Sequence, residues 1–284
     1  MLLLDKPSGM TSNAALQAVR RLFSAAKAGH TGTLDPLATG LLPLCFGEAT
    51  KFSADLLEAD KTYEAELLFG VTTDTGDAEG EVRERRPVDF SRAELEAVLP
   101  RFRGQIRQIP PMYSALKRDG KPLYELARQG IEVVREAREV TIRQLLLLDF
   151  SDDRCRLRVT CSKGTYIRTL AEDIGAALAC GAHLTALRRT AVGSLRIDDA
   201  LTLDQLNRLA AEARGGCLQA PDALLQTLPA VCLDGEAATR FTHGNPVSAV
   251  TPLGRCRVYA DNRLLGLGEA DAQGRVHPRR LVSI

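Results

Sequence analysis

Positions 154–161 alternate strictly between apolar and polar residues, and this alternation limits the folds that are open to the chain. Cysteine, leucine and valine occupy one set of alternate positions, and arginine and threonine occupy the other. Successive side chains of a strand point to opposite faces, so the pattern predicts a strand with one buried and one exposed face. A break at Lys163-Gly164 precedes apolar residues at helical spacing from Ile167 to Leu178, which predicts a helix that packs by one face.

Local patterns place further elements along the chain. The predicted elements are a helix over 12–23, a Gly- and Pro-punctuated loop over 29–47, a strand over 63–69, helices after the capping boxes at Ser91 and Thr202, and an irregular basic segment over 107–139 with a short helix near 123–129. From Val231 onward, short apolar strands alternate with turns, which predicts a small β-rich appendage of about 55 residues. We therefore expect an α+β protein with a central mixed, mainly antiparallel sheet flanked by helices. No GxGxxG or GxxxxGK[ST] motif occurs, so nucleotide-cofactor folds lose support.

The charge of the chain is nearly balanced overall but is unevenly distributed. The formal net charge is +1. Residues 55–96 hold thirteen acidic and five basic residues, whereas residues 101–143 hold ten basic and five acidic residues. Residues 253–284 hold six basic and three acidic residues. This asymmetry is compatible with basic patches that face a polyanion, and ordinary solvated surface is the alternative.

The cysteines and the hydropathy pattern bear on the cellular compartment. The seven cysteines are scattered without a CxxC pair, so neither a zinc knuckle nor a redox dithiol is indicated. No apolar run approaches the roughly 18 residues that a membrane-spanning helix needs. The opening Leu2-Leu3-Leu4 is too short for the core of a signal peptide. We therefore expect a cytoplasmic protein without a membrane partner.

The segment from Gly29 to Gly40 is the strongest candidate for a catalytic loop. Pro36 disfavours the α conformation at Asp35 and so extends the backbone there. The glycines permit tight turns and the close approach of a ligand. A carboxylate held in such a loop suits a nucleophile or a general base. An Asp-Pro turn with a capping carboxylate is the structural alternative, and these residues alone favour it.

Seven ordered segments resemble the motifs of the TruB family of tRNA pseudouridine-55 synthases. The segments are Leu4-Asp5-Lys6-Pro7 with Gly9, Thr11 and Ser12; Gly29 to Gly40; Lys61-Thr62-Tyr63; Thr73-Asp74-Thr75 with Asp77 and Gly80; Gln108 to Ala115 with Lys117; Lys163 to Arg168; and Gly181 to Arg189. Together they fall within residues 2–193. The tail resembles the PUA-like RNA-binding appendage of bacterial members.

The resemblance implies a pseudouridine synthase fold with two domains. Residues 1–228 would form the catalytic domain, which would include a basic RNA-gripping insertion over 107–139. Residues 229–284 would form the PUA-like RNA-binding domain. The implied activity is an isomerisation of uridine 55 in the T-loop of tRNA to pseudouridine, which proceeds by base flipping. The implied partner is the T-arm stem-loop of tRNA, with no guide RNA, no metal and no organic cofactor, and the protein would be a monomer.

The resemblance also implies roles for three catalytic residues. Asp35 would attack or deprotonate the target nucleoside, whose glycosidic bond breaks before the base is rejoined through carbon. Arg168 would pair with Asp35 and keep it ionised, because a nearby cation lowers the pKa of a carboxyl group. Tyr63 would stack on the flipped uracil and help to move the C5 proton. A surface arginine and a half-buried strand tyrosine are the structural alternatives for the last two.

The remaining implied site residues would bind the substrate. His30 would fill or brace the stack that the base leaves, Leu187 would wall the pocket, and Asp77 would be a second partner of Arg168. Lys6 would contact the substrate from the amino-terminal motif. Three basic residues of the insertion would grip phosphates: Lys117, Lys121 and Arg128.

Three other functions remain open from the sequence. A related synthase could act on another RNA uridine or use a guide RNA, although the long basic extensions expected of a guided enzyme are absent. An RNA-binding or tRNA-folding module with a vestigial pocket is a second possibility, which the intact Asp35, Tyr63 and Arg168 disfavour. An Asp-dependent hydrolase is a third, but no second catalytic carboxylate or histidine has a matching context.

Overall fold

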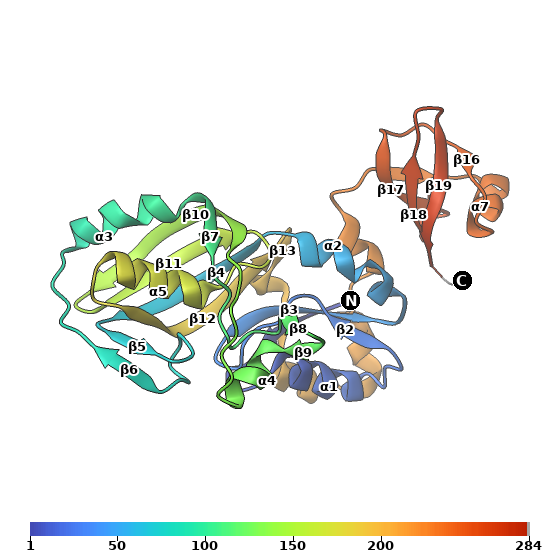
Figure 1. Cartoon of the computed structure of the whole chain (residues 1–284). Coiled ribbons are helices and arrows are strands. Elements are labelled where there is room, and N and C mark those ends of the chain that lie inside the picture. Colours follow the sequence, from blue (N-terminus) through green and yellow to red (C-terminus); the bar gives the residue numbers. More distant parts are fainter. Residues whose placement is uncertain (283–284) are drawn as a thin grey trace.

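A ten-stranded mixed sheet forms the centre of the computed structural model, which describes residues 1–282 (Figure 1). The main path of the sheet runs β14-β1-β3-β12-β4-β11-β10-β7, with β13 beside β12 and β2 beside β3. The strands are β1 (Leu2–Lys6), β2 (Ala28–His30), β3 (Thr39–Phe46), β4 (Lys61–Phe69), β7 (Gly104–Gln108), β10 (Arg138–Ser151), β11 (Arg154–Cys161), β12 (Ala182–Val192), β13 (Leu195–Arg196) and β14 (Leu201–Thr202). Only the pairs β1–β14 and β3–β12 are parallel within this sheet, so the predicted mainly antiparallel arrangement is confirmed.

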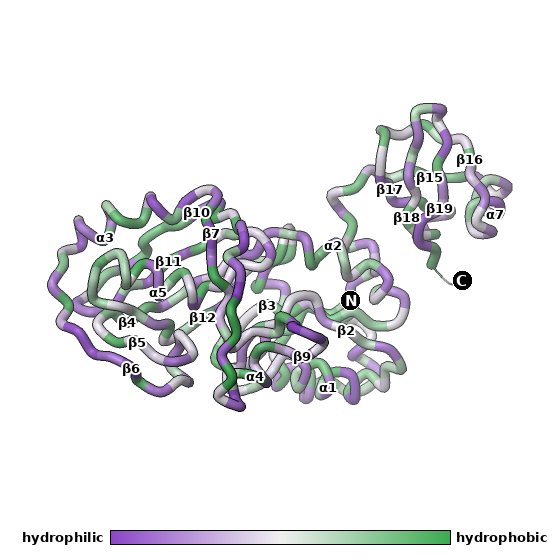
Figure 2. The backbone as a smooth tube through the Cα atoms, in the orientation of Figure 1, coloured by the Kyte–Doolittle hydropathy of each residue, from purple (hydrophilic) through white to green (hydrophobic). Residues whose placement is uncertain are grey.

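Short helices flank the central sheet, except α7, which packs on the carboxy-terminal strands. The α-helices are α1 (Ser12–Leu22), α2 (Ser53–Glu58), α3 (Arg92–Val98), α4 (Leu123–Arg128), α5 (Ile167–Ala177), α6 (Leu203–Arg208) and α7 (Gly235–Thr242). The 3-10 helices are η1 (Gly47–Phe52), η2 (Leu99–Phe102), η3 (Ile197–Asp199), η4 (Ala211–Cys217) and η5 (Pro221–Leu225). Two small hairpins complete the main body, β5 (Val71–Thr73) with β6 (Val82–Arg85) and β8 (Lys117–Arg118) with β9 (Lys121–Pro122). Figure 2 shows mostly hydrophilic residues along β6, whose four residues are all exposed.

The alternation over 154–161 does produce a half-exposed strand. In β11 the alternate positions from Cys155 to Cys161 are at most 2% exposed. The opposite face carries arginines that pair with glutamates of β4, Arg158 with Glu64 at 2.7 Å and Arg154 with Glu66 at 3.4 Å. The helix predicted after Lys163-Gly164 is α5, which buries one face against the sheet.

The carboxy-terminal strands form a second sheet with its own apolar core. The order is β15-β17-β18-β19-β16, and the strands are β15 (Ala230–Cys232), β16 (Val247–Ser248), β17 (Gly254–Ala260), β18 (Arg263–Ala270) and β19 (Arg275–Leu281). Its core includes Phe241, Val258 and Val276, each fully buried. This unit projects from the main body (Figure 1), to which an ion pair of 2.6 Å between Arg255 and Asp55 joins it. Residues 283 and 284 of the predicted second domain lie outside the described residues.

Several predicted elements are confirmed, and one is wrong. The helix near 12–23, the helices after both capping boxes, the strand over 63–69 and the short helix near 123–129 are present as α1, α3, α6, β4 and α4. The predicted loop over 29–47 is a loop only over 31–38, because Thr39–Phe46 forms the buried strand β3. This strand is covered on both faces and therefore reads as a continuous apolar run rather than as an alternation. Within residues 1–282, no helix is long and apolar enough to cross a membrane.

Candidate active site

A cavity of about 420 Å³ opens at the loop between β2 and β3. Four of the predicted site residues line it: Asp35, Tyr63, Arg168 and Leu187. These residues come from four separate parts of the chain, which the order of strands in the sheet brings together. Three residues of the insertion, Ser114 to Leu116, line another side of the cavity. The sheet therefore assembles one pocket from motifs that are far apart in sequence.

The Asp35 loop (residues 31–38) connects β2 to β3. It leaves β2 at His30 and returns through Thr39 into β3, which lies beside β12. Gly40 has φ of +102°, and a Cβ atom there would lie 2.3 Å from the backbone oxygen of Arg189. Only glycine permits both this conformation and this close approach. The glycine thus allows the loop to pack directly against β12.

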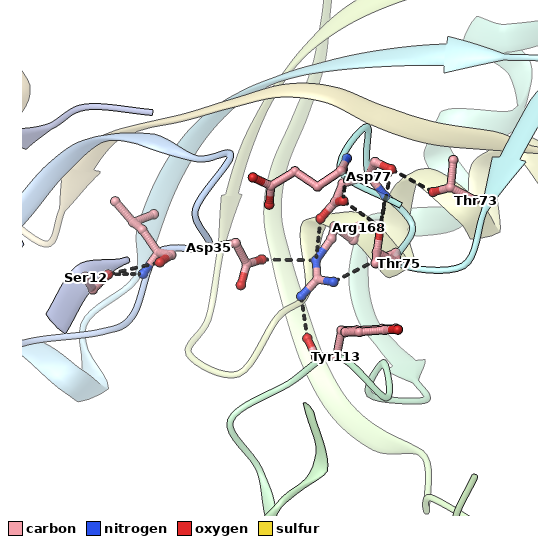
Figure 3. A network of polar contacts seen from close by, with 9 residues as sticks. Ser12, Asp35, Thr73, Thr75, Asp77, Tyr113 and Arg168 are labelled. Atoms are coloured by element: carbon pink, nitrogen blue, oxygen red, sulfur yellow. Dashed lines mark hydrogen bonds and ion pairs between the residues drawn. The ribbon is translucent and has the colours of Figure 1, made fainter. Parts of the chain in front are cut away.

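Arg168 joins three of the predicted motifs at one guanidinium (Figure 3). It lies in the first turn of α5, and its side chain is only 5% exposed. Its Nε lies 3.0 Å from the Asp35 carboxylate and 3.7 Å from the Asp77 carboxylate. Its two Nη atoms donate to the backbone oxygens of Thr75, at 2.8 Å, and of Tyr113, at 2.7 Å. The Asp35 loop, the acidic turn and the insertion therefore all meet at this side chain.

The Asp77 carboxylate is held in place by hydrogen bonds in addition to its contact with Arg168. The residue is 3% exposed, and one carboxylate oxygen accepts hydrogen bonds from the Thr75 hydroxyl, at 2.6 Å, and from the Glu79 amide, at 3.1 Å. The other oxygen is the one that faces Arg168. A carboxylate oriented in this way holds the guanidinium in one position, so that Arg168 does not have to be ordered by the substrate.

Burial, rather than the arginine, has the largest effect on the acidity of Asp35. Loss of solvent raises the pKa of the Asp35 carboxyl group, and the neighbouring Asp77 charge raises it further. The Arg168 guanidinium and the Lys6 ammonium oppose this rise without reversing it. Arg168 therefore pairs with Asp35 and lowers its pKa in the expected direction, but desolvation of the half-buried carboxylate, which the sequence did not reveal, outweighs the attraction of this cation.

This raised pKa predicts how the reaction depends on pH. If the reaction needs ionised Asp35, its rate falls as pH falls through the pKa of that group. The midpoint is expected above the ordinary value of about 3.9 for aspartate. Single-turnover rates from about pH 4 to pH 8, on protein shown to remain folded, measure this fall in rate at low pH, which we call the acid limb. A midpoint at or below the ordinary value would contradict the burial-dominated site.

Tyr63 and Arg189 form a direct cross-strand pair on the floor of the cavity. Both side chains line the cavity, and the two residues are register partners in β4 and β12. Burial raises the pKa of the Tyr63 phenol, against the opposing influence of Arg189. The phenol is therefore protonated at neutral pH, which suits a stacking surface that also carries a hydroxyl group.

The cavity also has polar lining residues that the sequence did not identify as site residues. They include Lys61, Tyr166 and Arg189, each of which lies within one of the motifs given above. Arg189 is 1% exposed and donates to the backbone oxygens of Leu41, at 2.7 Å, and of Gly32, at 3.0 Å. The ammonium of Lys61 donates to three carbonyl oxygens at the end of α2, and burial lowers its pKa to about 8. The alternation of β4 gives a usable signal, since Lys61 and Tyr63 share the face of the buried residues from Ala65 onward.

Lys6 is not placed to bind substrate, so that prediction is wrong. The residue is fully buried. Its ammonium donates to the backbone oxygens of Pro7, Met10 and Pro36, which occupy its three hydrogens. Burial lowers the pKa of Lys6 to about 8. A sequence motif shows that a lysine is present but not whether its side chain points outward. In this protein the Lys6 side chain points inward and supports the Asp35 loop from behind.

The other predicted binding residues lie around the cavity rather than in it. His30 is half-buried at the end of β2 and is not among the lining residues. Lys117, Lys121 and Arg128 are exposed on β8, β9 and α4 of the insertion. Arg128 also lies over the ring of Tyr124, with its guanidinium carbon 5.4 Å from the ring centroid. These three exposed cations thus belong to the same insertion that lines the cavity through Ser114 to Leu116.

Family models match nearly the whole chain. The model described as "TruB family pseudouridylate synthase (N terminal domain)" matches residues 20–167. The model "tRNA pseudouridylate synthase B C-terminal domain" matches residues 168–230, and "Pseudouridine synthase II TruB, C-terminal" matches residues 229–282. The last match covers the second sheet and its core.

Curated relatives give the same family, and a solved structure shares the fold. The chain is 64% identical over 285 residues to tRNA pseudouridine synthase B of Dechloromonas aromatica (strain RCB), a match that covers 100% of this chain and 95% of that protein. It is 61% identical over 289 residues to tRNA pseudouridine synthase B of Burkholderia lata, covering 99% of this chain and 89% of that protein. One chain of the archaeal box H/ACA sRNP Nop10–Cbf5 complex shares the fold, with a TM-score of 0.74 at 24% identity, over 99% of this chain and 85% of that one.

Proposed function

The chain belongs to the TruB family of tRNA pseudouridine synthases and is an isomerase of that class, and from this premise we propose that it converts uridine 55 in the T-loop of tRNA to pseudouridine. The predicted pseudouridine synthase fold, with its small β-rich carboxy-terminal unit, is confirmed by the comparison of structures.

The observation that carries the proposal is the ion pair of Asp35 with the buried Arg168 at the edge of the cavity. In the proposed reaction the glycosidic bond breaks with its electron pair on the base, the base turns, and its C5 forms a new bond to the sugar. The C5 proton is lost and N1 gains one, so the composition of the nucleoside does not change. An ionised Asp35 acts on the nucleoside in this sequence, and Arg168 holds the carboxylate in place.

The target uridine has to leave the folded RNA loop to reach Asp35. Extrusion of a nucleotide costs a few kcal/mol, which contacts in the pocket have to offset. Stacking of the base on Tyr63 contributes about 1–3 kcal/mol, and Leu187 supplies an apolar wall. His30 lies outside the cavity lining. This position suits a residue that braces the opened RNA loop and does not contact the extruded base.

We assign the binding of the RNA to two parts of the chain, the basic insertion and the carboxy-terminal unit. Residues 1–228 form the catalytic domain in this proposal, with the insertion over 107–139 as its RNA-gripping part. Residues 229–284 form the PUA-like RNA-binding domain. The second apolar core, around Phe241 and Val258, supports a boundary near residue 228. The exposed cations of the insertion support binding to the phosphates of the RNA, which depends on the shape of the RNA rather than on its bases.

A substrate series tests the proposed function. The unmodified T-arm stem-loop, with uridine at position 55, is expected to be converted by the purified chain without guide RNA. The same stem-loop with cytidine at that position is expected to give no product, although it binds. Pseudouridine is measured by chemical mapping of the RNA. Conversion of a uridine elsewhere in the stem-loop, with position 55 untouched, would overturn the assignment of the site.

Replacing Lys117, Lys121 and Arg128 together by alanine is expected to weaken RNA binding in a salt-dependent way. Each lost phosphate contact removes a released counterion, so the slope of log Kd against log salt flattens by about 0.7–0.9 per contact. Binding titrations at several salt concentrations measure the slope. A control variant removes three exposed arginines away from the cavity, Arg92, Arg101 and Arg154, and is expected to keep the slope. Equal slopes in both variants would remove the insertion from the RNA interface.

A further inference from the structure

The backbone on both sides of Asp35 is bound by the amino-terminal segment from Lys6 to Ser12, which we call the amino-terminal clamp. On the carboxyl side, the backbone oxygen of Pro36 accepts from the amide of Gly9, at 2.9 Å, and from the ammonium of Lys6, at 3.4 Å. The residue that follows Asp35 is therefore tied to a segment about thirty residues earlier in the chain.

On the amino side, one hydroxyl group binds both polar backbone atoms of the residue before Asp35. The Ser12 hydroxyl donates to the backbone oxygen of Leu34 at 3.0 Å and accepts from the Leu34 amide at 2.8 Å (Figure 3). Ser12 is 1% exposed and Leu34 is 3% exposed. Little solvent therefore reaches these backbone groups, so a bridging water is poorly placed to replace the hydroxyl.

We propose that Ser12 is a positioning residue of the active site, whose hydroxyl places the Asp35 carboxylate against Arg168 and the reacting nucleoside. This inference rests on the proposed function of Asp35. Arg168 is held separately, by the backbone oxygens of Thr75 and Tyr113 and by Asp77. Loss of the Ser12 hydroxyl therefore moves Asp35 without moving the arginine that it has to meet.

The chemistry of the hydroxyl group explains why serine suits this place. A hydroxyl is both a donor and an acceptor, so one small side chain satisfies the amide and the carbonyl of Leu34 together. Alanine leaves both groups buried without partners, and the loop has to shift to reach others. Displacement of a reacting group by about 1 Å can cost about 100-fold in rate, even when the altered residue lies behind the site.

Single-turnover kinetics on the T-arm stem-loop test this role. Ser12→Ala is expected to react about 10–100-fold more slowly than the natural protein, with an RNA Kd within about three-fold. Its acid limb is expected to move to higher pH, because a looser contact with Arg168 opposes protonation of Asp35 less. The matched control is Thr11→Ala, which removes the neighbouring side-chain cap of α1, a hydrogen bond to the Ala14 amide that lies within the helix.

The outcomes separate a positioning role from a merely structural one. Thr11→Ala is expected to lower the melting temperature while keeping both the rate and the acid limb. A natural rate in folded Ser12→Ala, or an equal loss of rate in Thr11→Ala, would overturn the proposal. If Ser12→Ala does not fold, Ser12→Cys serves instead, since a thiol is a weak donor and acceptor, and an unchanged rate in that variant would also overturn it. An inactive natural protein on this substrate would instead refute the proposed function.

Discussion

Replacing Asp35 by asparagine is expected to lower the single-turnover rate by about 10³-fold or more while leaving the affinity for tRNA within about three-fold. Asparagine has nearly the same shape as aspartate, but it carries no charge and does not act as a nucleophile or a base. The RNA contacts proposed here lie on the insertion, on Tyr63 and on the carboxy-terminal unit, and the substitution leaves them in place. Rapid-quench measurement of pseudouridine, with a parallel binding titration, gives both quantities.

The stability of this variant follows from the same pKa direction. The folded-state pKa of Asp35 is raised, so the fold favours the protonated carboxyl group. Its contribution to stability is present below its unfolded-state pKa and is lost as pH rises through the folded-state pKa. Asp35→Asn is therefore expected to keep or raise the melting temperature at neutral pH. A large loss of stability would mean that the lost rate reflects misfolding.

A matched control separates the chemistry of Asp35 from a general effect of removing a carboxylate. Asp173 is a half-buried aspartate on α5 whose pKa is also raised by burial, and it does not line the cavity. Asp173→Asn is expected to retain the natural rate. If Asp35→Asn still turns over at a rate near that of this control, Asp35 is not the catalytic residue and the pocket serves RNA binding alone.

Arg168→Met is expected to damage both stability and rate. The substitution leaves the carboxylates of Asp35 and Asp77 without their cation and leaves the carbonyl oxygens of Thr75 and Tyr113 without a donor. Removing one partner of a buried ion pair costs about 3–5 kcal/mol. The rate is expected to fall by about 100-fold or more, because Asp35 loses its position. The acid limb is expected to move to higher pH, since Arg168 lowers the pKa of Asp35.

Asp77→Asn is expected to shift the acid limb in the opposite direction to Arg168→Met, and so tests the proposed arrangement of charges. The charge of Asp77 raises the pKa of Asp35, so its removal is expected to move the acid limb to lower pH. The amide can still accept from the Thr75 hydroxyl and the Glu79 amide, so the acidic turn is expected to stay in place. Shifts in the same direction for Arg168→Met and Asp77→Asn would contradict the proposed arrangement of charges.

The sequence predicts the fold well wherever a single face is buried. The alternation of β11 and the capping boxes before α3 and α6 are local signals, and the structure contains all three elements. Two central strands carry no such signal. β3 is an apolar run broken by Pro43, and β12 combines two arginines with threonines, although it lies at the centre of the sheet. Their strand state follows from neighbours that local sequence patterns do not specify.

The sequence predicts which residues form the site better than it predicts their orientations and pKa values. Asp35, Tyr63, Arg168 and Leu187 do line one cavity, and Asp77 does face Arg168. The orientation of Lys6 was not predictable, because an inward-pointing lysine and an outward-pointing one look alike in a motif. The net direction of the Asp35 pKa was not predictable either. It depends on how much solvent the folded chain removes, which is a property of the tertiary structure.

The contact of Ser12 with the Asp35 loop was not predictable from the sequence motif. As a residue next to a helix cap, Ser12 has an ordinary explanation, and only the three-dimensional structure brings its hydroxyl to Leu34. Motif residues around an active site thus divide into those that line the cavity and those that hold the lining in place. Lys6, Gly9 and Ser12 belong to the second group, which contacts the Asp35 loop from behind.

Nucleotide-resolution mapping of pseudouridine in unmodified tRNA, incubated with the purified chain alone, tests the central claim most directly. The expected result with the natural protein is one new pseudouridine, at position 55 in the T-loop, and the expected result with Asp35→Asn is none. A main product at another position, a requirement for added guide RNA, or the same product with Asp35→Asn would contradict the account.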